Sequence, residues 1–140
     1  DLKFYKVVKS EIESDGDVEL KTTEEVASFA ATKTTVVKGN LIIGSDAEEA
    51  EKITDISALA SLKEVTGNIV IRNSYNGADL TGLDNIVSAG GLQVGSTDVA
   101  SKATELHMIS MKALETLSGD ISVYNDQVTY VLIEKLATIE

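Results

Sequence analysis

The 140 residues are enough for one domain with its own core, because 43% of them are apolar. The net charge is −11, from 23 acidic and 12 basic residues, which argues against nucleic acid and anionic membranes as partners. Cysteine is absent, which excludes disulfides, zinc–thiolate sites and thiol catalysis. No apolar run reaches the ~20 residues of a membrane span, and the polar start predicts no signal peptide within the chain.

The first 38 residues predict an N-terminal strand and a cap. Residues 2–9 alternate in polarity enough for a strand, and residues 15–17 (Asp-Gly-Asp) predict a turn. The apolar and polar alternation of Val18–Leu20 predicts a further strand directly after that turn.

A short helix is expected next, over residues Thr23–Ala31. Thr22 and Glu25 have the spacing of a capping box, in which the threonine begins the helix. Apolar residues then recur on one side of the helix. A repeat protein needs such an atypical terminal element, because its first repeat would otherwise expose its core.

Four later segments share one form: a glycine, a mostly polar residue, and two apolar residues separated by one. They are residues 39–43, 67–71, 90–94 and 119–123. Each is short and alternating, which is typical of a strand with one buried face. Alternation predicts that Leu41/Ile43, Ile69/Ile71, Leu92/Val94 and Ile121/Val123 point inward. It predicts that Ile42, Val70, Gln93 and Ser122 face outward, as a partner patch or as ordinary surface.

A second pattern has apolar residues at every third position. It comprises Ile56, Leu59, Leu62 and Val65; Leu80, Leu83, Ile86 and Ala89; Met108, Met111, Leu114 and Leu117; and Tyr130, Ile133, Leu136 and Ile139. This spacing fits neither a strand nor an α-helix, but it suits a chain that turns a corner about every three residues. We therefore expect a mainly β fold: a right-handed parallel β-helix, or leucine-rich-repeat-type solenoid, of about four coils over residues 39–140.

The best candidate ligand surface lies where two neighbouring strands end. Aromatic faces and amide donors suit sugars or peptides, and ordinary edge residues are the competing interpretation. The candidate residues are Arg72, Asn73, Tyr75, Asn76, Tyr124 and Asn125.

Residues 39–43 (Gly-Asn-Leu-Ile-Ile) and 53–71 (Ile-Thr-Asp-Ile-Ser-Ala-Leu-Ala-Ser-Leu-Lys-Glu-Val-Thr-Gly-Asn-Ile-Val-Ile) resemble receptor L-domain-like leucine-rich repeats. Such repeats occur in surface proteins of gut commensal bacteria and in some fungal cell-wall proteins. Residues 16–31 resemble the strand and cap helix that precede them, so the resemblance covers roughly residues 16–140. It implies a right-handed parallel β-helix, an extracellular or cell-surface setting, and a binding or structural role. The third repeat departs by one missing residue between Gly91 and Leu92.

No catalytic residues, metal ligands or cofactor are expected. His107 is the only histidine and is expected to face solvent; catalysis through it would need an activated nucleophile and an orienting acid nearby. Residues 15–19 lack the full ligand set of an EF-hand loop, and the acidic residues 46–51 are expected to be a solvated loop, with weak calcium binding as the alternative.

The favoured function is a non-enzymatic cell-surface binding or adhesion module for a protein or glycan. Two rivals remain: a structural spacer in a longer surface protein, and a polysaccharide-active β-helix enzyme. The enzyme is disfavoured because only Arg72 supplies a basic group near the sheet face. The chain stops where another strand is due, so we expect it to be a piece of a longer protein, or to meet further coils or another chain at this end.

Overall fold

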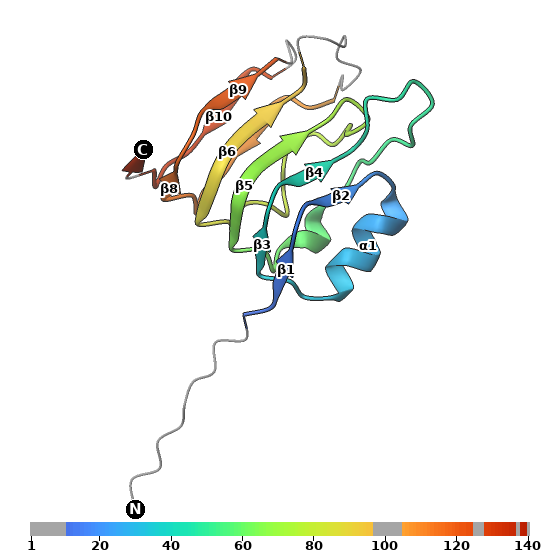
Figure 1. Ribbon diagram of the computed structural model, residues 1–140. Helices are drawn as coiled ribbons and strands as arrows, with labels where there is room; N and C mark the ends of the chain where they lie inside the picture. Colours follow the sequence, from blue (N-terminus) through green and yellow to red (C-terminus); the bar gives the residue numbers. More distant parts are fainter. Residues whose placement is uncertain (1–10, 97–104, 125–127, 137, 140) are drawn as a thin grey trace, which may run out of the picture.

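The computed structural model describes residues 11–96, 105–124, 128–136 and 138–139 (Figure 1). Within these residues the chain is mainly β, with one α-helix, and the strands pair in parallel. The expected mainly β class is confirmed. The strand predicted at residues 2–9 lies outside the described residues.

The elements follow one another in a regular order along the described chain. They are β1 (Glu13–Asp15), β2 (Val18–Leu20), α1 (Thr23–Ala31), β3 (Val36–Lys38), β4 (Leu41–Ile43), the 3₁₀ turn η1 (Ser57–Leu59), β5 (Glu64–Ile71), β6 (Ser88–Val94), β7 (Met108–Ser110), β8 (Thr116–Leu117), β9 (Ile121–Val123), β10 (Tyr130–Leu132) and β11 (Thr138–Ile139).

The main sheet is assembled from strands that lie one repeat apart in the sequence. β1, β3, β5, β6, β8 and β11 lie side by side in that order. β2 pairs with β4, β4 with β5, and β9 with β6, so these strands continue the same sheet beyond β1, β3 and β8 (Figure 1). β3 therefore belongs to the sheet, since it pairs with both β1 and β5.

The inward-facing side chains of successive strands stack in register. Ile43, Ile71, Val94 and Val123 occupy one row of partners, and Leu41, Ile69, Leu92 and Ile121 occupy another. The members from β4, β5 and β6 are buried, whereas the two from β9 are half-buried. The alternation predicted from the sequence is confirmed. Ile42 is only 9% exposed despite facing outward, because it lies in register between Glu19 and Val70.

The three-residue pattern is confirmed in its first two sets, whose eight residues are all at most 2% exposed. In the third set, Met111, Leu114 and Leu117 are buried, but Met108 is only half-buried. Ile109 is buried instead of Met108. Side chains alternate along β7, and Ile109 is the one that points inward. Tyr130, which pairs with Met108, is 53% exposed, so the expected burial of Tyr130 is wrong.

The irregular third repeat appears as a β-bulge. Val65 pairs with Ala89 and Asn68 pairs with Gly91, so two residues of β5 face one residue of β6. The missing residue therefore falls beside Gly90 rather than between Gly91 and Leu92. A bulge absorbs one extra residue without changing which side chains face the core beyond it.

Glycines of successive repeats approach one another closely at one corner of the sheet. A Cβ atom added at Gly67 would meet backbone atoms of Gly39, one at Gly90 would meet those of Gly67, and one at Gly119 would lie 2.7 Å from the carbonyl oxygen of Gly90. Each repeat therefore needs a residue without a side chain at this corner.

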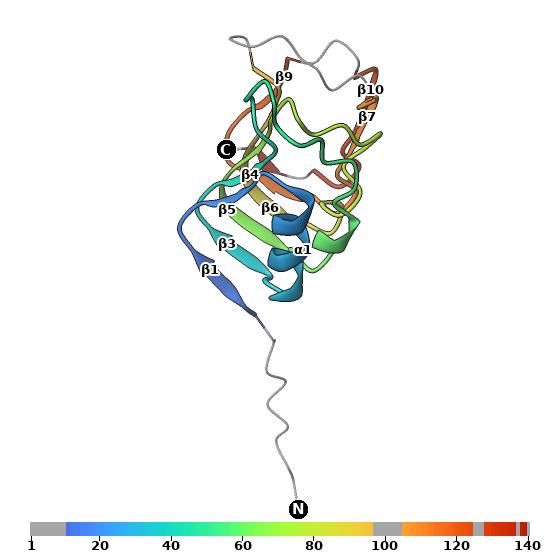
Figure 2. The same cartoon turned by 90° about the vertical axis from the view of Figure 1, so that its right-hand side faces the viewer.

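The predicted helix cap is present at one end of the sheet. The N–H of Glu25 donates to Thr22 Oγ1 at 3.0 Å, and the carboxylate of Glu25 accepts from the N–H of Lys21 at 3.1 Å. Val26 and Ala30 are buried on the inner side of α1, which contacts β2 and η1. Figure 2 shows α1 beside η1, with β1, β3 and β5 across from them.

A second, two-stranded sheet forms the side of the molecule across from the main sheet (Figure 2). β7 and β10 pair in parallel there, with Ile109 opposite Val131. Ile109 is buried, whereas Val131 is 47% exposed. None of the described helices is long and apolar enough to cross a membrane.

Candidate functional site

Arg72 lies directly after β5, on the outer face of the sheet. Its Nη1 atom is 3.8 Å from Asp46 Oδ2, a long and weak ion pair, and the side chain is 39% exposed. Its Nε atom is buried and forms no hydrogen bond within the described structure. The part of the Arg72 side chain that an approaching group can reach is therefore its exposed portion and not the buried Nε atom.

Asn73 and Tyr75 lie in the interior and not at the surface that the sequence suggested. Asn73 is 4% exposed, since it follows Ile71 by two positions and points to the same side. Its N–H donates to Asp46 Oδ1 at 3.0 Å, while its side-chain amide has no partner among the described residues. Tyr75 is 1% exposed, and its hydroxyl donates to the carbonyl oxygen of Asp79. Burial raises the pKa of the Tyr75 phenol.

The remaining predicted site residues, like Arg72, follow the ends of strands. Asn76 is half-buried, and its Oδ1 atom accepts from the N–H of Glu105 at 3.1 Å. Tyr124 follows β9 and is 44% exposed. Asn125 lies outside the described residues. The structure thus separates Asn73 and Tyr75 from the other candidates and leaves Arg72 and Tyr124 as surface residues.

Arg72 and Tyr124 stand on either side of Gly95. The N–H of Gly95 donates to the carbonyl oxygen of Ile71 and that of Tyr124 to the carbonyl oxygen of Val94, each at 2.8 Å, which continues the parallel ladder past the ends of the strands. Two strand spacings, about 10 Å, therefore separate Arg72 from Tyr124. The glycine leaves no side chain between them.

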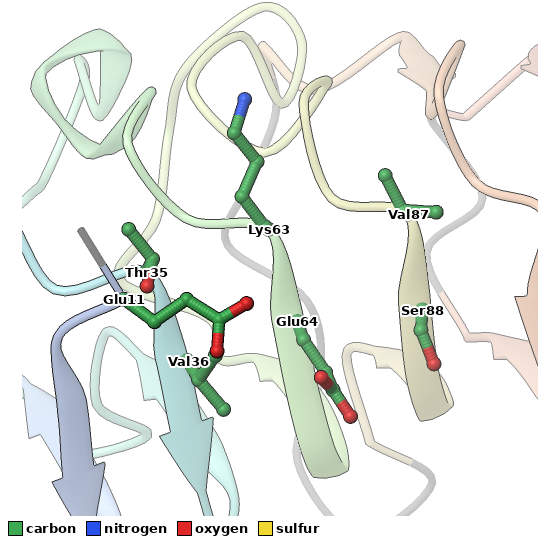
Figure 3. A pocket seen from close by; sticks show the side chains of 7 residues that line it. All are labelled: Glu11, Thr35, Val36, Lys63, Glu64, Val87 and Ser88. Carbon is green, nitrogen blue, oxygen red and sulfur yellow. The ribbon is translucent and has the colours of Figure 1, made fainter. Parts of the chain in front are cut away.

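A groove of about 560 Å³ lies on the outer face near the starts of the strands (Figure 3). Val36, Glu64 and Ser88 reach it from β3, β5 and β6, and Glu11 lies beside Val36. Thr35, Lys63 and Val87 complete its lining.

The charges near this groove are already paired in part. Lys38 Nζ lies 2.6 Å from Glu13 Oε2, and this hydrogen bond raises the pKa of Lys38. Both side chains are nearly half exposed, so the pair stabilises the fold little. The groove combines apolar and charged residues, which suits contact with another polypeptide.

A smaller cleft of about 330 Å³ opens over β6 on the same outer face. It is lined by Asn68, Leu92, Gln93, Gly119, Asp120 and Ser122. Analysis of the sequence missed Asn68 and Asp120 because they precede the strand cores. The sequence pattern that could have identified them is the position after the first glycine of each repeated segment. This position holds Asn40, Asn68, Gly91 and Asp120 in turn.

The described residues contain no cluster of three or more histidine, cysteine, aspartate or glutamate side chains that could hold a metal ion. His107 is exposed, as expected, and its carbonyl oxygen accepts from the N–H of Thr129 at 2.9 Å. The arrangements found on the outer face can hold a ligand through hydrogen bonds and apolar contact.

Comparison with known protein families gives one match. The family model described as "Receptor L domain" matches residues 33–127, more than half of the chain. The chain belongs to this family, whose members are ligand-binding, non-enzymatic modules and are typically extracellular. None of the curated proteins and none of the solved structures compared with the chain matches it.

Proposed function

We propose that this chain is a non-enzymatic binding or adhesion module of a cell surface, which recognises a protein or a glycan. The observation that carries this proposal is the outer face of the parallel sheet, where a groove and a cleft both open on paired strands. Sites on rigid strands hold their contacts in place better than sites on loops. The ligand-binding character of the receptor L domain family supports the same function.

The finer features of the proposal follow the resemblance described from the sequence. The repeats wind as a right-handed parallel β-helix of about four coils over residues 39–140, with residues 1–38 as its cap. The parent is a bacterial surface protein. Another polypeptide segment covers the apolar surface at Val131, which is 47% exposed on β10.

Within the proposed surface, Arg72 and Tyr124 are the sequence-predicted residues best placed for contact, because both are accessible from the outer face. Asn76 and Asn125 flank them in the sequence and belong to the proposed ligand edge. Asn73 and Tyr75 support it from within, since the N–H of Asn73 fixes Asp46, the partner of Arg72.

The test is binding of the purified chain to arrays of immobilised glycans and extracellular proteins. We expect saturable binding. A substitution that introduces a charged residue at the centre of the outer face should abolish this binding. Val70→Glu provides that change, because Val70 is half-buried there between Ile42 and Gln93. Ala47→Glu, in an exposed loop, is the matched control.

Two results would contradict the proposal. The absence of any ligand on either array would favour a structural spacer. Turnover of a polysaccharide panel that is lost in Arg72→Ala would favour an enzyme.

A further inference from the structure

The cleft over β6 lies beside a buried glycine that its neighbours crowd closely. Gly91 lies in register with Asn68 of β5, and β9 follows directly after Asp120 on the other side. A Cβ atom at Gly91 would lie 2.7 Å from Asn68 Oδ1 and 3.2 Å from the carbonyl oxygen of Asp120. Because of the β-bulge, Gly91 lies opposite Asn68. The neighbouring repeats carry a longer side chain at this position. The absence of a side chain at Gly91 therefore lets Asn68, which lines the cleft, lie close to the backbone of β6.

Polar side chains of several kinds surround this cleft. Asn68 and Asp120 are exposed, and Gln93 and Ser122 are half-buried on its floor and far side. The Nε2 atom of Gln93 donates to the carbonyl oxygen of Gly95 at 3.1 Å, which holds the amide in place. An amide, a carboxylate and a hydroxyl together offer both donors and acceptors, and vicinal hydroxyl groups of a sugar need both.

An exposed aromatic residue stands at the end of the same strand. Tyr124 follows Ser122 by two positions, so alternation places it on the outer face, next to the cleft. The residue is 44% exposed, and its ring can offer an apolar face to the C–H groups of a sugar ring. Arg72, with its unpaired Nε atom, lies across Gly95 from Tyr124.

The charge of the chain restricts the ligand further. The net charge is −11, and Asp120 lines the cleft itself, so an anionic sugar would be repelled. Arg72 is the only arginine, and it already faces Asp46. A cleft of about 330 Å³ is at the small end of ligand sites, which suits one or two sugar rings better than a folded protein surface.

We propose that this cleft binds a neutral oligosaccharide, in which Asn68, Gln93, Asp120 and Ser122 hold hydroxyl groups and Tyr124 packs against a ring face. The inference rests on the proposed binding function and narrows its ligand to one class. The larger groove near Val36 and Val87 is not part of this site.

The experiment uses the full chain on an array of neutral oligosaccharides and polysaccharides of glucose, galactose, mannose and xylose, followed by calorimetric titration of the best binder. We expect Asp120→Ala and Tyr124→Ala each to weaken binding about tenfold, the effect of losing one charged hydrogen bond or one packed ring. Glu115→Ala and Tyr130→Ala are the matched controls, since both residues are exposed and lie outside the cleft. The controls should bind as the parent chain does.

Two further readouts separate the possible outcomes. Binding of a neutral glycan should be unchanged between about 0.05 and 0.5 M NaCl, whereas binding of an anion would weaken as salt screens it. Thermal melting checks that each variant is folded. Glycan binding that Asp120→Ala and Tyr124→Ala leave unchanged would overturn the site. Failure to bind any glycan while a protein ligand binds would overturn this inference and leave the proposed binding function standing.

Discussion

Tyr75 is the bulkiest of the fully buried side chains in the described core, and its hydroxyl is satisfied by the carbonyl oxygen of Asp79. Burial raises the pKa of this phenol, and the carboxylates of Asp79 and Asp55 add to the effect. An unfolded tyrosine ionises near pH 10. Above about pH 10 the folded chain therefore keeps the Tyr75 proton that the unfolded chain loses. The contribution of Tyr75 to the free energy of unfolding is fully present below about pH 10 and falls as the pH rises further.

The prediction is that Tyr75→Phe weakens this alkaline dependence. At neutral pH the variant should be about 1 kcal/mol less stable, because the carbonyl oxygen of Asp79 loses its donor. Urea unfolding at several pH values from 7 to about 11 measures both effects. An equal loss of stability at high pH in both chains would show that Tyr75 is not the group responsible.

Ile71 lies in the middle of an inward-facing row and is 1% exposed. We expect Ile71→Ala to lower the free energy of unfolding by about 2–5 kcal/mol, because neighbours on both sides hold the cavity open. Val131→Ala, at a position 47% exposed, should change it by less than about 0.5 kcal/mol. Urea denaturation of the two variants compares them directly. Similar losses would mean that stacking between repeats does not stabilise the sheet.

At the scale of elements, the turn before β6 depends on Gly82. Its φ is +117°, and a Cβ atom would overlap the carbonyl oxygen of Ile56 in the previous repeat. We expect Gly82→Ala to cost about 3 kcal/mol or more, from backbone strain and displacement of Ile56 together. Gly16→Ala is the control, since φ there is +86° but nothing lies within 4 Å, and strain alone costs about 1–2 kcal/mol. Equal melting temperatures for the two variants would contradict the prediction.

The elements differ in how far local sequence determines them. The helix begins as predicted because Thr22 and Glu25 act within one turn of chain. The bulge could not be located, since Gly90 and Gly91 are chemically the same and only pairing with β5 distinguishes them. Met108 and Ile109 are both apolar, so the sequence alone does not tell which of them is buried. The alternation of side chains along β7 points Ile109 inward.

The candidate site was harder to predict than the fold. The surface positions of Arg72 and Tyr124 could be predicted, because both residues follow strands that the repeat pattern identifies. Tyr75 was misplaced because its burial depends on the bridge with Ile53, a contact between distant residues. The cleft was missed since its lining comes from three strands and the residues beside them, which only the pairing of the strands brings together.

At the scale of the whole molecule, the net charge of −11 opposes compaction. Screening of that repulsion should raise stability by about 1 kcal/mol between low salt and about 0.5 M NaCl, a rise of about 2–6 °C in melting temperature. The double variant Glu48→Gln and Glu49→Gln alters only exposed side chains and makes the net charge less negative. Salt should therefore raise the melting temperature of this variant by a smaller amount. Calorimetric melting in both chains at several salt concentrations is the measurement. Melting that is independent of salt would contradict the argument.

Because each strand of the main sheet pairs with one from the neighbouring repeat, no strand can find its partner until another whole repeat has been synthesised. A chain emerging from the ribosome would form α1 early, and the strands of each later repeat would then pair with strands that have already been made. Assembly would proceed in one direction, from the N-terminus, and every stage would leave one edge able to capture a strand from a second nascent chain. Synthesis in order would expose only one such edge at a time, whereas refolding of the complete chain from denaturant would expose all of them at once.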